Sequence, residues 1–473
     1  MDKNNSFNKF VSSLKKYPTN EVAKLFSKYE RDCYKDSEKG ILTEKEFDYK
    51  FYKQKIYIKP WLFPEIIYYS TSNNDHRNGT IVEDDAWDIY GLYQNYDMDK
   101  EDNHIEKSNT DENMVFTYIL YGIAQQQFIY QKSHRYINRF SRNYHLLKDI
   151  EIDGESLSTI VKEKFSISLK KYVEMLTLIT ILSMKNVVIN TEQILSIVKD
   201  KDLYLDIIDY LSVDYYECRN TKLKQDVFKV KPILHSQMDE YIVPSFCLMM
   251  YNLGDNLYWL LKDKFSKGNK FVVKFGEIFE NYVYEVLLKH FSEKVVRIPR
   301  VEGKKSADFY IESDKFVYLI EVKSGVAKLD SKTAVLNQKS LDDFIKNNVT
   351  DAILQIDASA QKFKNKRIVP IVANFDVLFT EDSLLHNIEN LCCVKNFNIK
   401  ETILLGIDDF ENFLYTYKNL EKIDKLIEDV LKDKNLLGGV KIYKLLENVR
   451  GHKNYYFKDV FNINKNILNQ KTD

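Results

Sequence analysis

Asp308, Glu321 and Lys323 have the residue types and spacing of a site for a divalent cation. The two acids lie in neighbouring strand-like runs that a short polar turn separates, so a hairpin would bring Asp308 beside Glu321. Alternation along the second strand points Glu321 and Lys323 to one face and Val322 to the other. Two carboxylates are oxygen ligands for Mg²⁺ or Mn²⁺. Such an ion polarises a phosphoryl oxygen and activates water, and the Lys supplies a cation near the scissile phosphate.

A second interpretation of these residues is a surface hairpin whose charges face solvent. A Lys-rich chain can hold the D…ExK pattern by chance, so spacing alone does not separate the two interpretations. The apolar run 316–320 directly precedes Glu321. It favours a central strand, on which charged side chains need partners. The sequence therefore favours the metal site.

Residues on both sides of the hairpin could complete such a site. Upstream, Glu277 and Glu280 lie on an amphipathic helical segment, and a carboxylate there could reach the same ion. Downstream, Gln355 and Gln361 lie on a segment predicted to be helical. Gln355 is a candidate substrate contact, with an ordinary helix-surface side chain as the alternative.

A basic cluster precedes Asp308 in the sequence and consists of Arg297, Arg300, Lys304 and Lys305. These side chains could clamp a backbone phosphate of a nucleic acid, and we take Arg300 and Lys304 as candidate substrate-binding residues. A solvated rim is the alternative, because an acidic residue lies among them.

The same stretches resemble the PD-(D/E)XK nuclease superfamily, which has the restriction-endonuclease-like fold. Residues 276–280 (GEIFE) look like its first motif, G-x-x-F-E. Residues 306–308 (SAD) look like the second motif, and residues 321–323 (EVK) like the E-x-K third motif. The resemblance covers about residues 228–408, under half of the chain. Ala307 stands where the family's name-giving pattern has Pro, a variation that leaves the metal site intact.

The resemblance implies a role for each matching residue. Asp308 and Glu321 would be metal ligands for Mg²⁺ or Mn²⁺, with the main-chain carbonyl of Val322 as a third. Lys323 would be the catalytic lysine, which positions or deprotonates water. Glu280 would be an accessory acid that orients water on the metal. The match of Gln355 to the family pattern is looser.

Helical and strand-like patterns predict a mixed α+β chain. We expect an α-helical domain over residues 1–227, a restriction-endonuclease-like mixed sheet flanked by helices over 228–408, and a helical appendage over 409–473. The expected elements around the sheet are helices Phe246–Phe265, Val272–Phe291 and Glu411–Lys432, and strands Ala307–Glu312, Phe316–Val322 and Arg367–Phe375. The acidic run Asn95–Asn113 predicts a solvated loop, with a cover over a basic groove as the alternative.

Composition limits the classes of function. The 473 residues include 69 Lys and Arg and 70 Asp and Glu, which excludes a strongly basic protein such as a histone-like coat protein. Nucleic acid would therefore bind through a local patch of basic residues.

Five cysteines without a CxxC pair suggest neither a disulfide framework nor a zinc ribbon. The N-terminus has no apolar signal-peptide core, and the most apolar stretch, Tyr172–Ile189, predicts a buried helix instead of a membrane span. We therefore expect a cytoplasmic protein.

Three other motifs are weaker. Residues 303–306 (GKKS) look like the end of a P-loop, but Ile298 occupies the upstream glycine position, which excludes a P-loop ATPase. Arg139 and His145 resemble the R-x(4-6)-H arrangement of HEPN ribonucleases, which a helical surface explains more simply. His76 has no evident partner for a catalytic triad.

The sequence thus predicts a metal-dependent nuclease, with DNA favoured over RNA by the habit of the resembled family. The alternative is a binding or scaffolding subunit that binds nucleic acid without cleaving it. A nuclease with a large helical domain and no motor is typical of a prokaryotic anti-phage defence effector. Its helical part would then respond to a protein trigger or partner, and two copies could act together in double-strand cutting.

Overall fold

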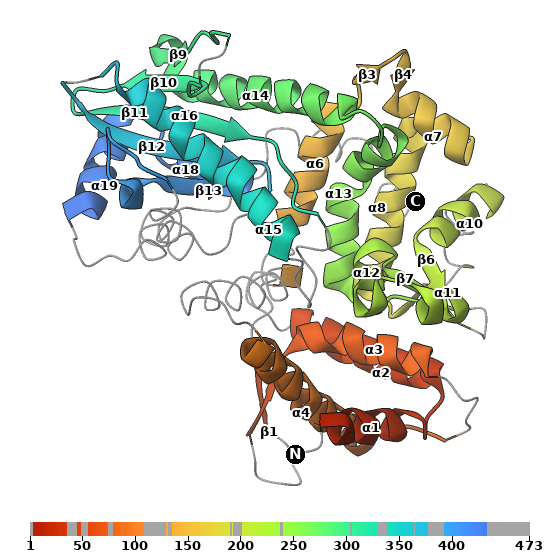
Figure 1. Ribbon diagram of the computed structural model, residues 1–473. Coiled ribbons are helices and arrows are strands. Elements are labelled where there is room, and N and C mark those ends of the chain that lie inside the picture. The colour runs from red at the N-terminus through yellow and green to blue at the C-terminus, as the bar shows by residue number, and fades with distance from the viewer. Residues whose placement is uncertain are drawn as a thin grey trace. The chain divides into compact units, whose positions relative to one another are not determined.

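The computed structural model of the chain (Figure 1) describes residues 3–35, 45–48, 55–73, 79–107, 129–130, 135–189, 192, 201–236, 240–302, 305–328, 338–363, 365–376 and 392–432. The described residues form two compact units that divide between Leu260 and Leu261, within α13 (Phe246–Lys264). The predicted boundary at 227/228 lies inside the first unit. Residues 409–432, predicted to belong to an appendage, lie in the second unit.

The first unit is mainly helical, as predicted, and also contains small sheets. Its helices are α1 (Lys3–Leu14), α2 (Thr19–Lys35), η2 (Pro60–Leu62), α3 (Phe63–Ser72), α4 (Glu83–Lys107), α6 (Arg135–Leu147), α7 (Leu157–Phe165), α8 (Leu169–Lys185), α10 (Lys201–Tyr210), α11 (Tyr215–Asn220), η3 (Lys224–Asp226) and α12 (Val227–Val230). Its strands are β1 (Lys45–Asp48), β2 (Lys55–Ile58), β3 (Glu151–Ile152), β4 (Glu155–Ser156), β5 (Val188–Ile189), β6 (Ser212–Asp214), β7 (Ile233–His235) and β8 (Tyr241–Ile242). The last four strands form one sheet in the order β5-β8-β7-β6.

The predicted loop at Asn95–Asn113 is wrong over residues 95–107, which belong to α4. Three acidic residues occupy the first turn of this helix, where their negative charges interact favourably with the positive end of the helix dipole and stabilise the helix. An apolar face then holds the helix against α1, and the rings of Tyr96 and Phe7 lie 4.9 Å apart. Local charge therefore misled the prediction, because tertiary packing of the aromatic residues decided the conformation. Residues 108–113 lie outside the described part of the chain.

The second unit is built on a five-stranded mixed sheet with the strand order β13-β12-β11-β10-β9. Its strands are β9 (Val295–Arg297), β10 (Phe309–Glu312), β11 (Phe316–Lys323), β12 (Arg367–Asn374) and β13 (Ile403–Gly406). Its helices are α14 (Lys270–Phe291), η4 (Ser292–Lys294), α15 (Gln338–Ile345), η6 (Lys346–Thr350), α16 (Asp351–Ala360), η7 (Ile399–Glu401), α18 (Ile407–Thr416) and α19 (Leu420–Lys432). The pairs β9/β10 and β10/β11 are antiparallel, and β11/β12 and β12/β13 are parallel.

Strand β11 is a central strand of this sheet, which confirms the prediction from its apolar run. Its side chains alternate between two apolar cores. Val317 and Leu319 belong to a buried core with residues of α16, which packs across β11 and β12 (Figure 1). Helix α14 also packs against β11, and α18 packs against β13. The coarse prediction of a mixed α+β fold is thus confirmed.

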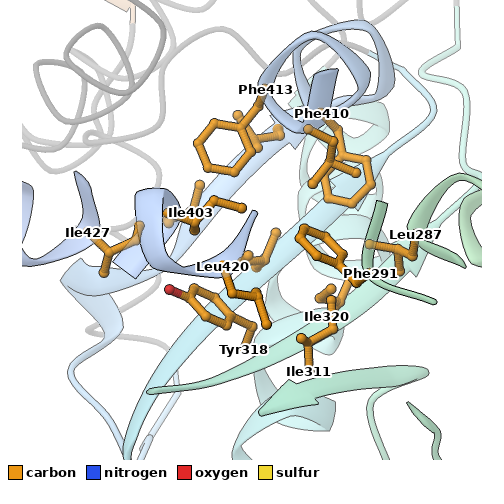
Figure 2. A pocket seen from close by; sticks show the side chains of 14 residues that line it. Leu287, Phe291, Ile311, Tyr318, Ile320, Ile403, Phe410, Phe413, Leu420 and Ile427 are labelled. Carbon is orange, nitrogen blue, oxygen red and sulfur yellow. The ribbon is translucent and has the colours of Figure 1, made fainter. Parts of the chain in front are cut away.

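On the other face, Tyr318 and Ile320 line a cavity of about 20 Å³ together with apolar residues of α14, α18 and α19 (Figure 2). The hydroxyl of Tyr318 donates a hydrogen bond to Asp424 Oδ1 at 2.6 Å. An apolar lining offers few polar partners to a water molecule or a polar substrate. We therefore regard this space as a packing gap in the core.

Candidate active site at the ends of β10 and β11

Asp308 directly precedes β10 and lies beside Glu321 of β11. The antiparallel register pairs Phe309 with Ile320, so the next position along each strand brings the two acids opposite each other. The main-chain N–H of Val322 donates to Asp308 Oδ2 at 2.9 Å. The hairpin geometry predicted from the sequence is therefore confirmed. Because N–H and C=O of one strand residue point to the same side, the carbonyl of Val322 also points toward the side of Asp308.

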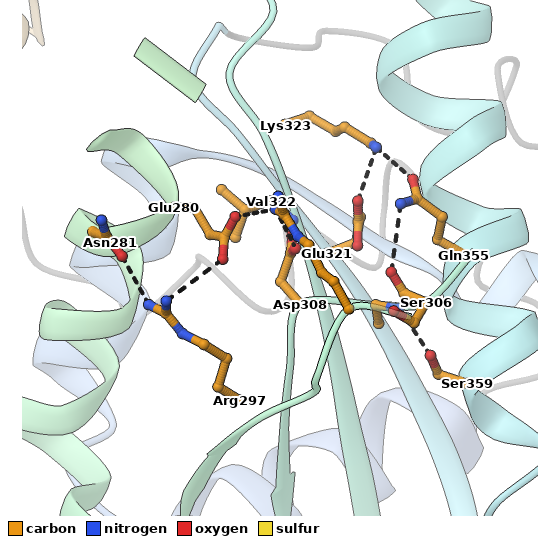
Figure 3. Close-up of polar contacts among 12 residues, drawn as sticks. Glu280, Asn281, Arg297, Ser306, Asp308, Glu321, Val322, Lys323, Gln355 and Ser359 are labelled. Carbon is orange, nitrogen blue, oxygen red and sulfur yellow. Dashed lines mark hydrogen bonds and ion pairs between the residues drawn. The ribbon is translucent and has the colours of Figure 1, made fainter. Parts of the chain in front are cut away.

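Lys323 shares a face of β11 with Glu321, as alternation predicted. Its Nζ lies 2.8 Å from Glu321 Oε1 and donates to Gln355 Oε1 of α16 at 2.6 Å (Figure 3). The ammonium group is therefore held between a carboxylate and an amide. Gln355, a candidate substrate contact in the sequence, is in this structure a direct partner of the candidate catalytic lysine.

Helix α16 also fixes the segment that leads into Asp308. Ser359 Oγ accepts a hydrogen bond from the main-chain N–H of Ala307 at 2.8 Å. One turn earlier, Gln355 Nε2 donates to the main-chain oxygen of Ser306 at 3.4 Å (Figure 3). Both contacts come from one face of the helix. They order the backbone that carries Asp308, so the position of this carboxylate depends on α16 as well as on the sheet.

Glu280 of α14 reaches the same region, but a guanidinium group lies between it and Asp308. Arg300 Nη2 contacts Glu280 Oε2 and lies 3.4 Å from Asp308 Oδ1. The Arg300 side chain is 72% exposed, whereas the Glu280 side chain is 14% exposed and that of Asp308 8%. A solvent-exposed cation thus neutralises two nearly buried carboxylates.

Arg297 is held differently, although it also lies near Glu280, with Nη1 3.9 Å from Glu280 Oε1. Its guanidinium donates to Asn281 Oδ1 at 2.9 Å (Figure 3). The group also lies 4.5 Å from the centre of the Tyr284 ring, a cation–π contact. Arg297 is therefore anchored on α14, whereas Arg300 is the more exposed of the two arginines.

Burial and repulsion from a neighbouring carboxylate raise the pKa of two acidic groups of the site, Glu321 and Glu280. Burial, followed by the neighbouring Asp308 carboxylate, raises the pKa of Glu321 well above its usual value, against the opposing effect of Lys323. Burial and Asp308 likewise raise the pKa of Glu280, against the arginine charges. Close carboxylates that resist simultaneous ionisation are stabilised by a cation, so the site favours a positively charged ligand.

The residues present fit a divalent metal ion. Glu321 Oε2 is buried and has no hydrogen-bond partner within the described part of the chain. Asp308, Glu321 and the carbonyl of Val322 are all hard oxygen donors, the type that Mg²⁺ and Mn²⁺ prefer. In the described ranges no group of three or more His, Cys, Asp or Glu side chains is arranged to hold a metal. Any metal here would therefore depend on two carboxylates, the main chain and water.

Several sequence candidates lie apart from this cluster. Glu277 is exposed on α14 and pairs with Lys274 at 3.4 Å, and Gln361 is exposed just past the end of α16. Lys305 pairs with Asp351 at 3.0 Å. Lys304 lies outside the described residues.

The HEPN-like residues lie in the first unit. The interpretation of Arg139 as a helix-surface residue is wrong, because its side chain is buried and forms an ion pair with the buried Asp255 of α13. A buried arginine of this kind needs a carboxylate partner within the fold. The ion pair gives Arg139 a structural role between α6 and α13.

Sequence reasoning did not predict the contacts of Ser306 and Ser359 with their partners, nor the position of Asn374 beside Lys323. The serine contacts depend on how α16 packs, for which the sequence gives no local signal. Asn374 does carry a weak signal, because a polar residue directly follows the apolar run of a predicted strand. Its relevance follows only from the parallel pairing of β12 with β11, which places it next to Lys323.

No protein-family model matches the chain, and neither a curated protein nor a solved structure shows significant similarity to it. No helix in the described ranges is both long and apolar enough to cross a membrane.

Proposed function

We propose that this chain is a metal-dependent nuclease that hydrolyses phosphodiester bonds, with DNA as the preferred substrate. The observation that carries the proposal is the convergence of Asp308, Glu321 and Lys323 at adjoining strand ends, in a central part of a mixed sheet. The three motifs that resemble the PD-(D/E)XK superfamily thereby come together in space. A five-stranded mixed sheet with helices on both faces also agrees with a restriction-endonuclease-like fold.

Each residue has a role that its environment supports. Asp308, Glu321 and the Val322 carbonyl would hold Mg²⁺ or Mn²⁺, which when bound polarises the phosphoryl oxygen and activates water. Lys323 presents its ammonium group beside Glu321, where it can orient water toward phosphorus and stabilise developing negative charge. Gln355 holds that ammonium group in place. Arg300 supplies a cation at the solvent side of the site, where a backbone phosphate would approach.

The wider biological role follows from this activity. A nuclease that carries a separate helical unit is suited to control by a protein trigger, and we propose a cytoplasmic anti-phage defence effector of this kind. The alternative function is a nucleic-acid-binding subunit that does not cut. The intact set of two carboxylates and a lysine speaks against it, because a binding module has no need for a metal-ligand pair beside a lysine.

Incubation of the purified chain with plasmid, linear duplex DNA, single-stranded DNA and RNA tests the proposal. Each substrate is combined with Mg²⁺, Mn²⁺ or EDTA. We expect metal-dependent cleavage that Lys323→Ala reduces by about 10²- to 10⁴-fold, the usual range for a general acid–base or water-orienting group.

The matched control is Lys315→Ala, which removes an exposed lysine at the opposite end of the same hairpin, paired with Glu428 at 2.8 Å. This variant should cleave as the wild type does. Equal activity of wild type and Lys323→Ala would contradict the proposed site. Metal-independent binding of DNA without cleavage would favour the binding subunit.

A further inference from the structure

Asn374 ends strand β12 immediately beside the candidate catalytic lysine. The parallel register of β11 and β12 pairs Lys323 with Asn374, and Glu321 with Val372. Val372 belongs to the core that faces α16. Because side chains alternate along a strand, Asn374 shares that face with Glu321 and Lys323. The sheet therefore places an amide side chain next to the proposed metal and water site.

The amide of Asn374 is buried and has no hydrogen-bond partner in the part of the chain that the structure describes. The residue is 1% exposed, and neither Oδ1 nor Nδ2 has a hydrogen-bond partner among the described residues. A buried amide in this state carries the full penalty of lost hydration. Buried polar groups that stay unpaired in a folded protein are rare, and functional sites are one of the places where they occur.

The backbone around Asn374 is firmly held, so the side chain has a defined position. The N–H of Phe375 donates to the carbonyl of Lys323 at 2.8 Å, which continues the parallel ladder. The Phe375 ring lies 4.9 Å from that of Phe275 on α14. Next along the chain, Asp376 Oδ2 accepts from the N–H of Ala327 at 2.9 Å. These contacts bind the chain that leaves β12 to α14 and to the segment that follows β11.

A second unpaired group lies on the same face. Glu321 Oε2 is also buried without a hydrogen-bond partner among the described residues. Two such groups on one face of neighbouring strands, with the Lys323 ammonium beside Glu321 and Lys323 itself paired in register with Asn374, suggest a common ligand. An amide offers one donor and one acceptor side, and a water molecule complements both.

We propose that Asn374 is a further site residue, whose side-chain amide binds and orients the attacking water. This inference rests on the proposed nuclease function. Asn374 Oδ1 would accept a hydrogen bond from an O–H group of the water. This contact would orient the water so that a lone pair of its oxygen points toward phosphorus. No proton is transferred to Asn374. Hydrolysis itself forms the bond from water oxygen to phosphorus and breaks the bond from phosphorus to the leaving oxygen, while the attacking water loses its proton to solvent and the leaving oxygen takes a proton from solvent.

The test replaces Asn374 by an apolar side chain that suits a strand. Asn374→Val removes an unpaired buried polar group, so the melting temperature of the metal-free protein should rise. The same change should lower kcat about 10- to 100-fold with KM unchanged, because water orientation contributes to the transition state only. Asn374→Ser supplies a hydroxyl group that can also form a hydrogen bond with water, so this variant should recover part of kcat.

Thr402→Val is the matched control. Thr402 is 2% exposed, its Oγ1 also lacks a hydrogen-bond partner among the described residues, and it precedes β13 at the edge of the same sheet. This variant should gain melting temperature with unchanged kcat. The control thus separates the removal of a buried polar group from the loss of a water ligand.

Three outcomes would overturn the inference. A lower melting temperature for both Asn374 variants would show a structural role. Unchanged kcat and unchanged KM of Asn374→Val would show that Asn374 has no part in the reaction. A raised KM with unchanged kcat would assign the amide to substrate binding and not to water. Failure of the nuclease proposal is recognised separately, because wild type would then cleave no substrate or Lys323→Ala would be as active as wild type. In that event the inference on Asn374 falls as well.

Discussion

The main-chain N–H of Val322 donates to Asp308 Oδ2 at 2.9 Å, so a side chain takes the place of a main-chain acceptor where the β10/β11 ladder ends. This contact holds one oxygen of Asp308 toward β11 and leaves Oδ1 on the side of Arg300. The proposed metal site therefore depends on a hydrogen bond at the end of a strand as much as on the identities of the two acids.

Removal of the Asp308 carboxylate should abolish metal binding. We expect Mn²⁺ to raise the melting temperature of the wild-type protein, because a ligand that binds only the folded state stabilises it. Asp308→Ala should remove this increase completely. Differential scanning fluorimetry over a range of Mn²⁺ concentrations measures it, with Asp314→Ala in the exposed turn of the same hairpin as the control. An equal response of wild type and Asp308→Ala would disprove the metal site.

Substitution of Arg300 should affect metal and DNA in opposite directions. Its guanidinium neutralises Glu280 and Asp308, so it competes with a metal ion for the same carboxylates. Arg300→Gln should therefore tighten Mn²⁺ binding about 3- to 10-fold, the range expected for the loss of one exposed competing charge. It should also weaken DNA binding. The slope of the logarithm of the DNA-binding constant against the logarithm of the salt concentration should become less steep by about one, as expected for the loss of one phosphate contact.

The control for this prediction is Arg297→Gln. Arg297 has the same charge and lies near the same Glu280, but it is anchored on Asn281 and the Tyr284 ring. Its substitution should change Mn²⁺ affinity less than that of Arg300. Isothermal titration with Mn²⁺ and salt-dependent DNA binding by fluorescence anisotropy measure the two effects. Weaker Mn²⁺ binding by Arg300→Gln would contradict the competition.

The stability of the metal-free protein should fall as the pH rises above the range in which free glutamates titrate. Burial and Asp308 raise the pKa of Glu321 and Glu280 in the folded state, so the folded state keeps these protons to higher pH than the unfolded state does. The free energy of unfolding then decreases with pH from about 4.3, the ordinary glutamate value, up through the raised pKa. Urea unfolding at a series of pH values measures this slope.

Glu321→Gln should flatten that pH dependence, because the amide does not titrate. Saturating Mn²⁺ should flatten it in the wild type, since the ion offsets the repulsion between the carboxylates. A slope that is identical in wild type and Glu321→Gln would show that Glu321 does not contribute.

Glu30 should be important for the stability of the first unit. Its buried carboxylate accepts hydrogen bonds from Ser245 Oγ at 2.7 Å and from the N–H groups of Phe246 at 3.1 Å and Cys247 at 3.3 Å, at the start of α13. Glu30→Ala removes a charged cap and leaves these donors unpaired. We expect a loss of roughly 2 to 4 kcal/mol in the free energy of unfolding.

Chemical denaturation followed by circular dichroism measures the effect of Glu30→Ala. Glu21→Ala on the same helix is the control, because Glu21 is 47% exposed and pairs with Lys24 at 3.7 Å across one turn. This change should cost less than about 0.5 kcal/mol. Equal losses for the two variants would mean that the cap on α13 is not a significant source of stability.

The sequence by itself determined the parts of the fold that depend on local periodicity. The helical spacing predicted α13 and α14 to within a few residues, and period-two alternation predicted the faces of β11. The pairing of Asp308 with Glu321 followed as well, because a short polar turn permits only a narrow range of registers for a hairpin. These features depend mainly on interactions between residues that are close together in the sequence.

Tertiary structure decided what depends on contacts between distant segments. Strand β9 and strand β13 have only three and four residues and little local signal, so they are recognisable as strands through their pairing in the sheet. Residues 95–107 continue helix α4, which packs against α1 through the ring of Tyr96, although the charges of this segment suggested a loop. The division between the two units within α13 also has no signal in composition.

The candidate site shows the same separation. Residue types and spacing identified Asp308, Glu321 and Lys323, since a hairpin and strand alternation are local rules. The contact of Gln355 with Lys323, the position of Arg300 between two acids, and the neighbouring Asn374 required the packing of α16, the path of the chain after β9 and the parallel pairing of β12. Hydrogen bonds and charge interactions act over a few ångströms in space, and only the folded chain determines which distant residues lie within that range.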